Sequence, residues 1–332
     1  MTEPLVEVVM PTVGRPSLTA ALAPLLGRIP VVVVDDRPGT PGPLDLPDGV
    51  RVVRSGGRGP AAARNAGWHT SRATWVAFLD DDVRPPSTWV AALHRDLARC
   101  APDVGGTQGR LVVPLPTDRR PTDWERSTAG LETAVWATAD LAYRRQTLRQ
   151  AGGFDGRFPR AYREDADLGL RVVAAGWRIA RGTRQVEHPV RPADWTQSIR
   201  SQRGNADDVL MRALHGPRWR ARAHVPPGRR RWHLATAASL LLSLGGAVVG
   251  SRRTALAGAA AWLALTADLV VRRVAPGPRT PAEVATMTAT SAVLPLAAAA
   301  WWLTGWLRLP ALLRQPGPVP DDGGGTAVRN SA

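Results

Sequence analysis

The amino-acid sequence predicts an α/β fold that is followed by transmembrane helices towards the C-terminal end. Residues 1 to about 230 alternate short β-like runs with helical patterns and carry nearly all of the acidic residues. From Trp232 onward the sequence changes to blocks that are rich in Ala, Leu and Val. This change places a domain boundary near the Pro-Pro-Gly segment at residues 226–228. A chain of 332 residues is long enough for two domains.

The first 36 residues read as a βαβ unit. Strands are expected at residues 5–10 and 31–34, with a helix-like stretch at residues 17–26 between them. An acidic pair at residues 35–36 follows the second strand and could contact a ribose or a base. The loop after the first strand lacks the G-x-G-x-x-G pattern of dinucleotide-binding enzymes, so a nucleotide would have to be held in a different way.

A glycine-rich loop at residues 55–60 runs into a predicted helix at residues 61–68. Backbone N–H groups at the start of that helix, with Arg58 or Arg64 nearby, could bind a diphosphate. Glycine-rich loops are also commonly simple turns, and composition alone does not decide between the two.

Three consecutive carboxylates, Asp80 to Asp82, close an apolar run at residues 73–79 that is typical of a buried parallel strand. Ligands gather beyond the carboxyl ends of such strands. Carboxylate oxygens at this place suit Mg²⁺ or Mn²⁺ held together with substrate phosphates. The alternative is a solvated turn before a helix that opens near Ser87.

A second acidic group begins a predicted helix. Gly-Gly-Phe-Asp at residues 152–155 precedes Glu164 and Asp165, after which apolar residues repeat at helical spacing until Gly176, which fits a helix stop. The two acids therefore lie at the positive end of a helix dipole. They could simply cap the helix, or they could do chemistry there.

Six patterns thus occur in a fixed order along residues 5 to about 215: the Pro-Thr loop at 11–12, the acidic pair at 35–36, Ala-Arg-Asn-Ala-Gly at 63–67, Phe-Leu-Asp-Asp-Asp at 78–82, Gly-Gly-Phe-Asp at 152–155 and Glu-Asp-Ala-Asp-Leu at 164–168. In this order they resemble the family 2 glycosyltransferases. The resemblance implies a GT-A-type, Rossmann-like mixed sheet flanked by helices. It also implies a nucleotide-sugar donor, a divalent metal ion and inversion at the anomeric carbon.

The resemblance assigns roles residue by residue. Residues that match the nucleotide-sugar site are Thr12, Asp36, Arg64, Asp80 and Asp81. Asp82 matches the direct metal ligand, and His188 stands where some members supply a further ligand, although a lone histidine is often structural. Asp165 matches the catalytic base, and Glu164 beside it would help to place the acceptor.

The formal net charge of +15 comes entirely from arginine, because the sequence contains no lysine. Arginines gather at residues 218–231, directly before the first apolar block, where they suit a membrane surface better than nucleic acid. A single cysteine, Cys100, excludes an intrachain disulfide, and residues 1–4 do not resemble the start of a signal peptide. Residues 1–230 are therefore expected on the cytoplasmic side of a multi-pass protein of the cell membrane.

Three segments, at residues 233–250, 254–271 and 284–307, have about the length needed to cross a bilayer. The first two could instead form a re-entrant hairpin or buried helices. We therefore expect a catalytic domain at 1–228, a membrane domain with about three helices at 229–310, and a disordered tail at 311–332.

A hexosyltransferase-type glycosyltransferase is the predicted activity, with a lipid-linked or cell-envelope glycan as the acceptor. Transfer of a single sugar is expected, because no clear Gln-x-x-Arg-Trp pattern of the processive synthases follows Asp165. The alternatives are a metal-dependent nucleotidyltransferase and a non-catalytic membrane scaffold. A nucleotidyltransferase often has a glycine-rich loop with a basic residue directly after the first strand, whereas residues 11–15 contain one glycine and one arginine. A scaffold has no need of two acidic sites.

Overall fold

The computed structural model describes residues 5–39 and 42–320, and it divides into two compact units. One, called the sheet unit here, consists of Met1–Val112, Glu132–Pro189 and Gln315–Ala332. The other, called the helical unit, consists of Val113–Leu131 and Val190–Arg314. The final part of the predicted tail, residues 321–332, lies outside the described residues.

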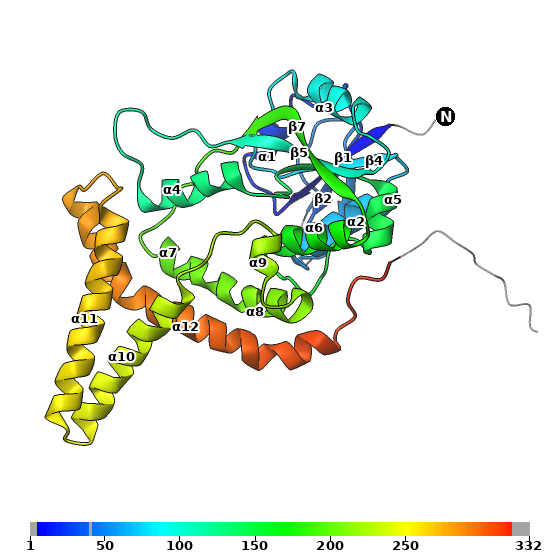
Figure 1. Ribbon diagram of the computed structural model, residues 1–332. Coiled ribbons are helices and arrows are strands. Elements are labelled where there is room, and N and C mark those ends of the chain that lie inside the picture. The colour runs from blue at the N-terminus through cyan, green and yellow to red at the C-terminus, as the bar shows by residue number, and fades with distance from the viewer. Residues whose placement is uncertain (1–4, 40–41, 321–332) are drawn as a thin grey trace, which may run out of the picture. The chain divides into compact units, whose positions relative to one another are not determined.

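The sheet unit contains a seven-stranded mixed sheet in the order β3-β2-β1-β4-β6-β5-β7. Figure 1 labels β1, β2, β4, β5 and β7. The strands are β1 (Val6–Thr12), β2 (Val31–Asp35), β3 (Arg51–Arg54), β4 (Trp75–Leu79), β5 (Val104–Val112), β6 (Asp140–Arg144) and β7 (Arg178–Glu187). β6 runs antiparallel to β4 and β5, while the other neighbouring pairs are parallel. The carboxyl ends of β1, β2, β3, β4, β5 and β7 therefore share one edge.

The central strands are buried because helices cover the sheet. Every residue of β2 and β4 is buried, as their continuous apolar runs predict. The helices of this unit are α1 (Leu18–Leu22), α2 (Pro60–His69), α3 (Trp89–Ala98), α5 (Arg145–Ala151) and α6 (Glu164–Ala174). The expected α/β fold with a mixed, helix-flanked sheet is confirmed, although α1 is shorter than the expected stretch at residues 17–26.

A buried ionic network holds β7 against the rest of the sheet unit. The guanidinium of Arg184 is fully buried and pairs with Asp140 at 2.7 Å and with Asp96 at 3.1 Å. The indole N–H of Trp89 donates to the second oxygen of Asp140 at 2.9 Å. Because α3, β6 and β7 each contribute to this network, it fixes the end of β7, where His188 follows.

The helical unit contains a 34-residue helix and a helical hairpin. Its helices are α4 (Asp123–Ala129), α7 (Gln197–Arg200), η2 (Ser201–Arg203), α8 (Gly204–His215), α9 (Trp219–Arg222), α10 (Arg230–Val248), α11 (Arg252–Val274) and α12 (Pro281–Arg314). A short turn of 3₁₀ helix, η1 (Gly130–Thr133), lies where the chain passes back to the sheet unit.

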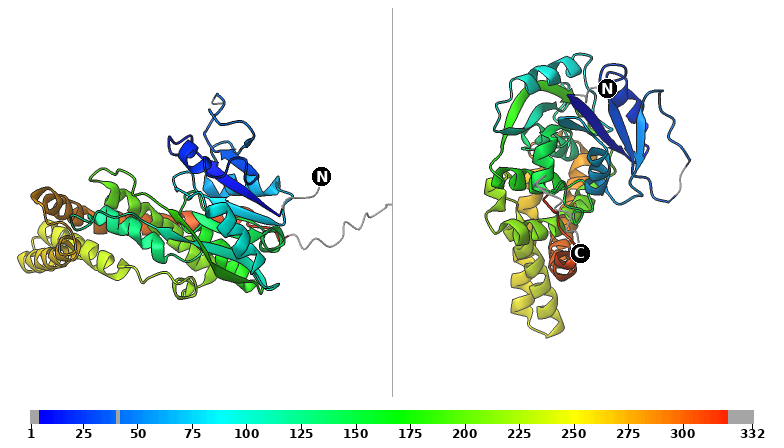
Figure 2. Two further views of the ribbon diagram at one scale, coloured as in Figure 1. Left: turned by 90° about the horizontal axis from the view of Figure 1, so that it is seen from above. Right: turned by 90° about the vertical axis from the view of Figure 1, so that its right-hand side faces the viewer.

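Helices α10 and α11 lie side by side (Figures 1 and 2). Glycines make this close packing possible: a Cβ atom at Gly246 would lie 2.5 Å from the backbone of Ala255, and one at Gly258 would lie 2.5 Å from that of Ser243. Helices α10, α11 and α12 cover the three segments that were expected to span a membrane. Among the described residues, α11 and α12 are the helices long and apolar enough to do so.

Candidate functional site

The acidic loop after β4 and the residue after β7 meet at the carboxyl edge of the sheet. Nε2 of His188 lies 3.8 Å from a carboxylate oxygen of Asp82, and one ligand atom each of Asp80, Asp82 and His188 lie within 4.8 Å of one another. A pair of backbone hydrogen bonds between Arg84 and Glu187, of 2.8 and 3.2 Å, brings the two segments together.

This group of side chains has the chemistry of a divalent metal site. Two carboxylates and one imidazole offer oxygen and nitrogen ligands, a set that accepts Mn²⁺ and Mg²⁺. Asp82 and His188 are buried, and Nδ1 of His188 has no hydrogen-bond partner among the described residues. The residues present therefore fit the metal ion that the sequence implies.

Arg64 connects this group to the start of α6. Its side chain is almost completely buried, and its two terminal nitrogens donate to Asp80 at 2.8 Å and to Glu164 at 2.9 Å. The sequence placed Arg64 beside a nucleotide. In the structure its guanidinium holds two carboxylates that lie 84 positions apart in the chain (164 − 80).

The start of α6 combines a buried acid with a partly exposed one. Glu164 is buried, and its Oε2 has no hydrogen-bond partner within the described residues. Burial and the neighbouring Asp165 raise the pKa of Glu164 to about 8, although Arg64 opposes the shift. Asp165 is less enclosed and accepts a hydrogen bond of 2.7 Å from the N–H of Ala166, while desolvation raises its pKa as well.

Neither acid acts as the N-cap of α6. That position belongs to Arg163, whose backbone is left-handed with φ of 78° and whose side chain makes no capping hydrogen bond. A non-glycine residue in this conformation is strained and often found at functional sites. The arrangement turns the first residue of α6, Glu164, inward towards Arg64.

Thr12 and Asp81 form a direct pair. The hydroxyl of Thr12 donates to Asp81 at 2.6 Å, and the guanidinium of Arg15 pairs with the other oxygen of Asp81. Asp81 is buried, which raises its pKa against the opposing effects of Thr12 and Arg15. Arg15 had no assigned role from the sequence. The one signal for it was a basic residue in the loop that follows the first strand.

Asp36 ties the glycine-rich loop to the end of β2. Its carboxylate accepts hydrogen bonds from the hydroxyl of Ser55 at 2.6 Å and from the N–H of Gly59 at 3.0 Å. Arg58 in the same loop donates to the carbonyl of Ser55 at 2.8 Å. The loop therefore has a defined course into α2, which begins with Pro60 at its first position.

Trp136 packs against the helix that carries the second acidic group, and no sequence pattern pointed to it. Its backbone has φ of 66°, and its N–H donates to the side chain of Gln108 at 2.6 Å. A Cβ atom at Gly169 would lie 2.2 Å from the indole ring. Gly169 follows Asp165 by four residues, so Trp136 covers the same face of α6 one turn below that acid.

The family model "Glycosyl transferase family 2" matches residues 7–165. These residues form a family 2 glycosyltransferase domain. The matched stretch runs from β1 to the first turn of α6 and includes the acidic loop, Arg64 and Asp165. The family predicted from the sequence is thus confirmed for residues 7–165.

Curated relatives point in the same direction. The pre-mycofactocin glycosyltransferases of two Mycobacterium tuberculosis strains, CDC 1551 / Oshkosh and ATCC 25618 / H37Rv, are each 30% identical to this chain over 194 residues. The match covers 52% of this chain and 40% of each relative. The chain therefore spans less than half the length of the curated relatives it matches.

Solved structures give a more distant likeness. Glucosyl-3-phosphoglycerate synthase from Mycobacterium tuberculosis, in complex with Mn²⁺, UDP-glucose and phosphoglyceric acid, matches with a TM-score of 0.43 and 15% identity, covering 68% of this chain and 81% of that one. A structure described as a mycobacterial protein matches with a TM-score of 0.43 and 18% identity, covering 68% of this chain and 76% of that one.

Proposed function

We propose that this protein is an inverting glycosyltransferase that moves a sugar from a nucleoside diphosphate donor to a hydroxyl acceptor by metal-assisted single displacement. One observation carries the proposal: Arg64 joins the Asp80–Asp82–His188 group to the Glu164–Asp165 pair. A transferase of this kind needs a site for the departing diphosphate and a base for the incoming hydroxyl, and the two must be held near one another.

Asp80, Asp82 and His188 would hold the divalent metal ion. When bound, the ion would stabilise the negative charge that develops on the departing nucleoside diphosphate. The protein's own part is to keep the ligands in place: Arg64 restrains Asp80, and the Arg84–Glu187 backbone pair sets His188 beside Asp82.

The nucleoside would lie beside Thr12, Asp36 and Asp81 at the carboxyl edge of β1, β2 and β4. Asp36 is held by the hydroxyl of Ser55 and the N–H of Gly59, so its position is fixed before a ligand binds. Thr12 and Asp81 restrain one another in the same way. Such prior organisation lowers the entropic cost of binding a donor.

Asp165 would take the proton from the attacking hydroxyl of the acceptor. Its carboxylate is partly exposed, and a pKa raised by desolvation makes it a stronger base than an ordinary aspartate. Glu164, enclosed beside it, would orient α6 through Arg64 and help to place the acceptor. Attack from the face opposite the diphosphate gives inversion in one step.

The acceptor would be a lipid-linked or cell-envelope glycan, reached by an enzyme held in a membrane. Helices α11 and α12 are long and apolar enough to cross a bilayer, and large apolar side chains on α10 and α11 are exposed. Examples of such side chains are Leu241, Leu242, Val248, Leu256, Leu263 and Val271. We include α10 as a further membrane helix of a multi-pass arrangement. The arginines before α10 favour the cytoplasmic side of the membrane, so the catalytic domain would lie on that side.

The proposal is tested by donor hydrolysis. The full chain, purified in detergent, is incubated with UDP-glucose, UDP-galactose, GDP-mannose or dTDP-rhamnose, each with Mn²⁺, with Mg²⁺ or with EDTA, and the released nucleoside diphosphate is measured. We expect one donor to be hydrolysed only in the presence of metal. Asp82→Asn should abolish this release, whereas Glu187→Gln, which changes an exposed carboxylate beside His188, should not.

Release of product without metal, or equal rates for Asp82→Asn and the unchanged protein, would contradict the proposal. With a hydroxyl acceptor that is turned over, the anomeric configuration of the product, determined by NMR, decides between inversion and retention. Formation of inorganic pyrophosphate from a nucleoside triphosphate would instead support a nucleotidyltransferase.

A further inference from the structure

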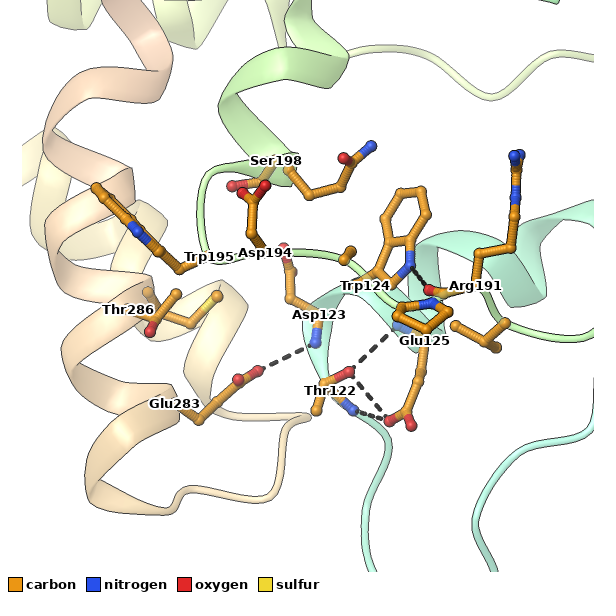
Figure 3. A pocket seen from close by; sticks show the side chains of 15 residues that line it. Thr122, Asp123, Trp124, Glu125, Arg191, Asp194, Trp195, Ser198, Glu283 and Thr286 are labelled. Carbon is orange, nitrogen blue, oxygen red and sulfur yellow. Dashed lines mark hydrogen bonds between the residues drawn. The ribbon is translucent and has the colours of Figure 1, made fainter. Parts of the chain in front are cut away.

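The helical unit contains a cavity of about 400 Å³ that shares no residue with the site described above. Three segments line it: the first turn of α4, the loop that joins β7 to α7 together with the start of α7, and the first two turns of α12 (Figure 3). The volume lies within the range of about 300–1,000 Å³ that is common for small-molecule sites.

Two tryptophans contribute to the lining of this cavity. Trp124 comes from α4, and its indole N–H donates to the carbonyl oxygen of Arg191 at 2.8 Å, which holds the ring in place (Figure 3). Trp195 comes from the loop and is 63% exposed. Tryptophan side chains are usually largely buried, so this exposure is uncommon. The cavity thus offers two flat apolar surfaces from different elements.

Carboxylates lie between the two indoles, and each already has partners. Asp194 accepts hydrogen bonds from the N–H and hydroxyl of Thr196 at 2.8 and 2.6 Å and pairs with Arg200 at 2.5 Å. Asp123 pairs with Arg273 at 2.8 Å. These contacts compensate the charge and fix the side chains, while a carboxylate keeps further lone pairs that can accept hydrogen bonds.

The start of α12 completes the wall. Glu283 accepts a hydrogen bond of 3.1 Å from the backbone N–H of Asp123, and Met287 adds apolar surface. Arg273, which holds Asp123, also donates to Thr290 at 2.8 Å and to Ser291 at 3.0 Å. α4, α11 and α12 are therefore linked through one buried guanidinium, which keeps the cavity's shape.

We propose that this cavity binds a carbohydrate. A pyranose ring has an apolar C–H face that stacks on an indole and an edge of hydroxyl groups that donate to carboxylates, and the lining supplies both surfaces. A phosphate is disfavoured, because four carboxylates line the cavity: Asp123, Glu125, Asp194 and Glu283. A metal ion is disfavoured too, because arginines already compensate Asp123 and Asp194.

The carbohydrate would be a sugar of the acceptor other than the one that reacts, and this assignment rests on the proposed function. The site lies at the first turns of α12, one of the two candidate membrane helices. The end of a helix that crosses a bilayer lies near the membrane surface, and a glycan carried on a lipid would present its sugars there. Binding itself does not depend on turnover, so it can be measured separately.

Saturation-transfer NMR with the methyl glycosides of glucose, galactose and mannose tests the proposal. The full chain is placed in phosphatidylcholine nanodiscs, because alkyl glucoside and maltoside detergents would compete for a sugar site. We expect at least one glycoside to bind. Trp195→Ala should weaken it by about tenfold, the loss expected when a central aromatic contact is removed.

Two matched variants serve as controls. Trp195→Phe keeps an aromatic face and should retain most of the binding, while Trp232→Ala removes another exposed tryptophan of the helical unit, 54% exposed and outside the cavity, and should retain all of it. Because Trp195 is largely exposed, its replacement should leave the melting temperature unchanged.

The proposal is overturned if no glycoside binds to the unchanged chain, if Trp195→Ala binds as well as the unchanged chain, or if inorganic phosphate displaces the sugar. Hydrolysis of the nucleotide sugar, measured on the same samples, distinguishes the two proposals. Hydrolysis without glycoside binding rejects the carbohydrate site alone, and Trp195-dependent binding without hydrolysis rejects the transferase proposal alone.

Discussion

Arg64 and Glu164 form a contact of 2.9 Å in which both side chains are almost completely buried, with exposed fractions of 2% and 3%. The second terminal nitrogen of Arg64 holds Asp80. A single guanidinium thus connects the strand end that carries the proposed metal ligands to the helix end that carries the proposed base. The relative position of the two chemical groups depends on this side chain.

Replacement of Arg64 by Met should destabilise the protein by about 1–3 kcal/mol, because it leaves a buried acid without its donor. The loss is limited, since Glu164, whose pKa is already raised to about 8 beside Arg64, stays protonated and uncharged when the guanidinium is gone. The free energy of unfolding in urea, followed by tryptophan fluorescence, measures this effect. The double variant Arg64→Met/Glu164→Gln should recover part of the loss, and strict additivity of the two changes would argue against a direct interaction.

The stability of the protein should fall as the pH rises from about 4.5 to about 8. Over this interval the folded protein keeps the proton on Glu164, whose pKa is raised to about 8, while the unfolded chain releases it near the ordinary value of 4.5. Proton release favours the unfolded state, so the free energy of unfolding decreases as the pH rises. Glu164→Gln cannot ionise and should show a smaller decrease in melting temperature across this interval; an identical decrease in both proteins would disprove the assignment.

Asp165→Asn should lower turnover by at least about a hundredfold, the contribution typical of a general base, while donor affinity stays nearly unchanged. The amide is close in size to the carboxylate but cannot accept the proton. Turnover is measured with donor and acceptor, and donor affinity by titration of the same preparation. Near-normal turnover in this variant would rule out Asp165 as the base, and lost donor affinity would indicate a different role.

His188→Ala should weaken binding of Mn²⁺ by at least about tenfold, because one of three candidate ligands is removed. Electron paramagnetic resonance of free Mn²⁺ measures the affinity without any substrate. His94→Ala, which changes a partly exposed histidine of α3 outside the group, is the matched control. Equal affinities for the His188 variant and the control would limit the site to the two aspartates.

Gly169→Ala should destabilise the sheet unit by about 1–3 kcal/mol, the usual cost of forcing an extra carbon into a packed interior. The added methyl group would lie 2.2 Å from the ring of Trp136. Gly156→Ala is the control, because a Cβ atom there meets nothing within 4 Å. A similar free energy of unfolding for both variants would show that Trp136 can move away, and it would remove the argument that this ring fixes α6.

Three of the seven strands, β1, β2 and β4, could be predicted from the sequence because they are largely apolar runs. β2 and β4 correspond to the apolar runs expected at residues 31–34 and 73–79, and every residue of both strands is buried. The strands β3, β5, β6 and β7 were not predicted. β3 is an edge strand of four residues that begins and ends with arginine and is largely exposed, so it carries no apolar pattern.

The candidate site was predictable only where a motif carried it. The acids at Asp82 and Asp165 belong to recognisable patterns, whereas the contacts that place them do not. No local signal indicates that Arg64 reaches Glu164, 100 positions away, or that Trp136 lies on Gly169. Such contacts depend on how the helices pack against the sheet. A single sequence gives the identity of the residues but not the distances between them.

Gly67 allows α2 to pack closely against the sheet, and the position of Arg64 depends on this packing. A Cβ atom at this position would lie 2.4 Å from Val9 and 2.9 Å from Val34, so α2 rests directly on the sheet there. Arg64 lies one turn earlier on that helix. A single methyl group at Gly67 would lift the helix axis and draw the guanidinium away from both acids at once, so the smallest residue of α2 sets the reach of its longest side chain.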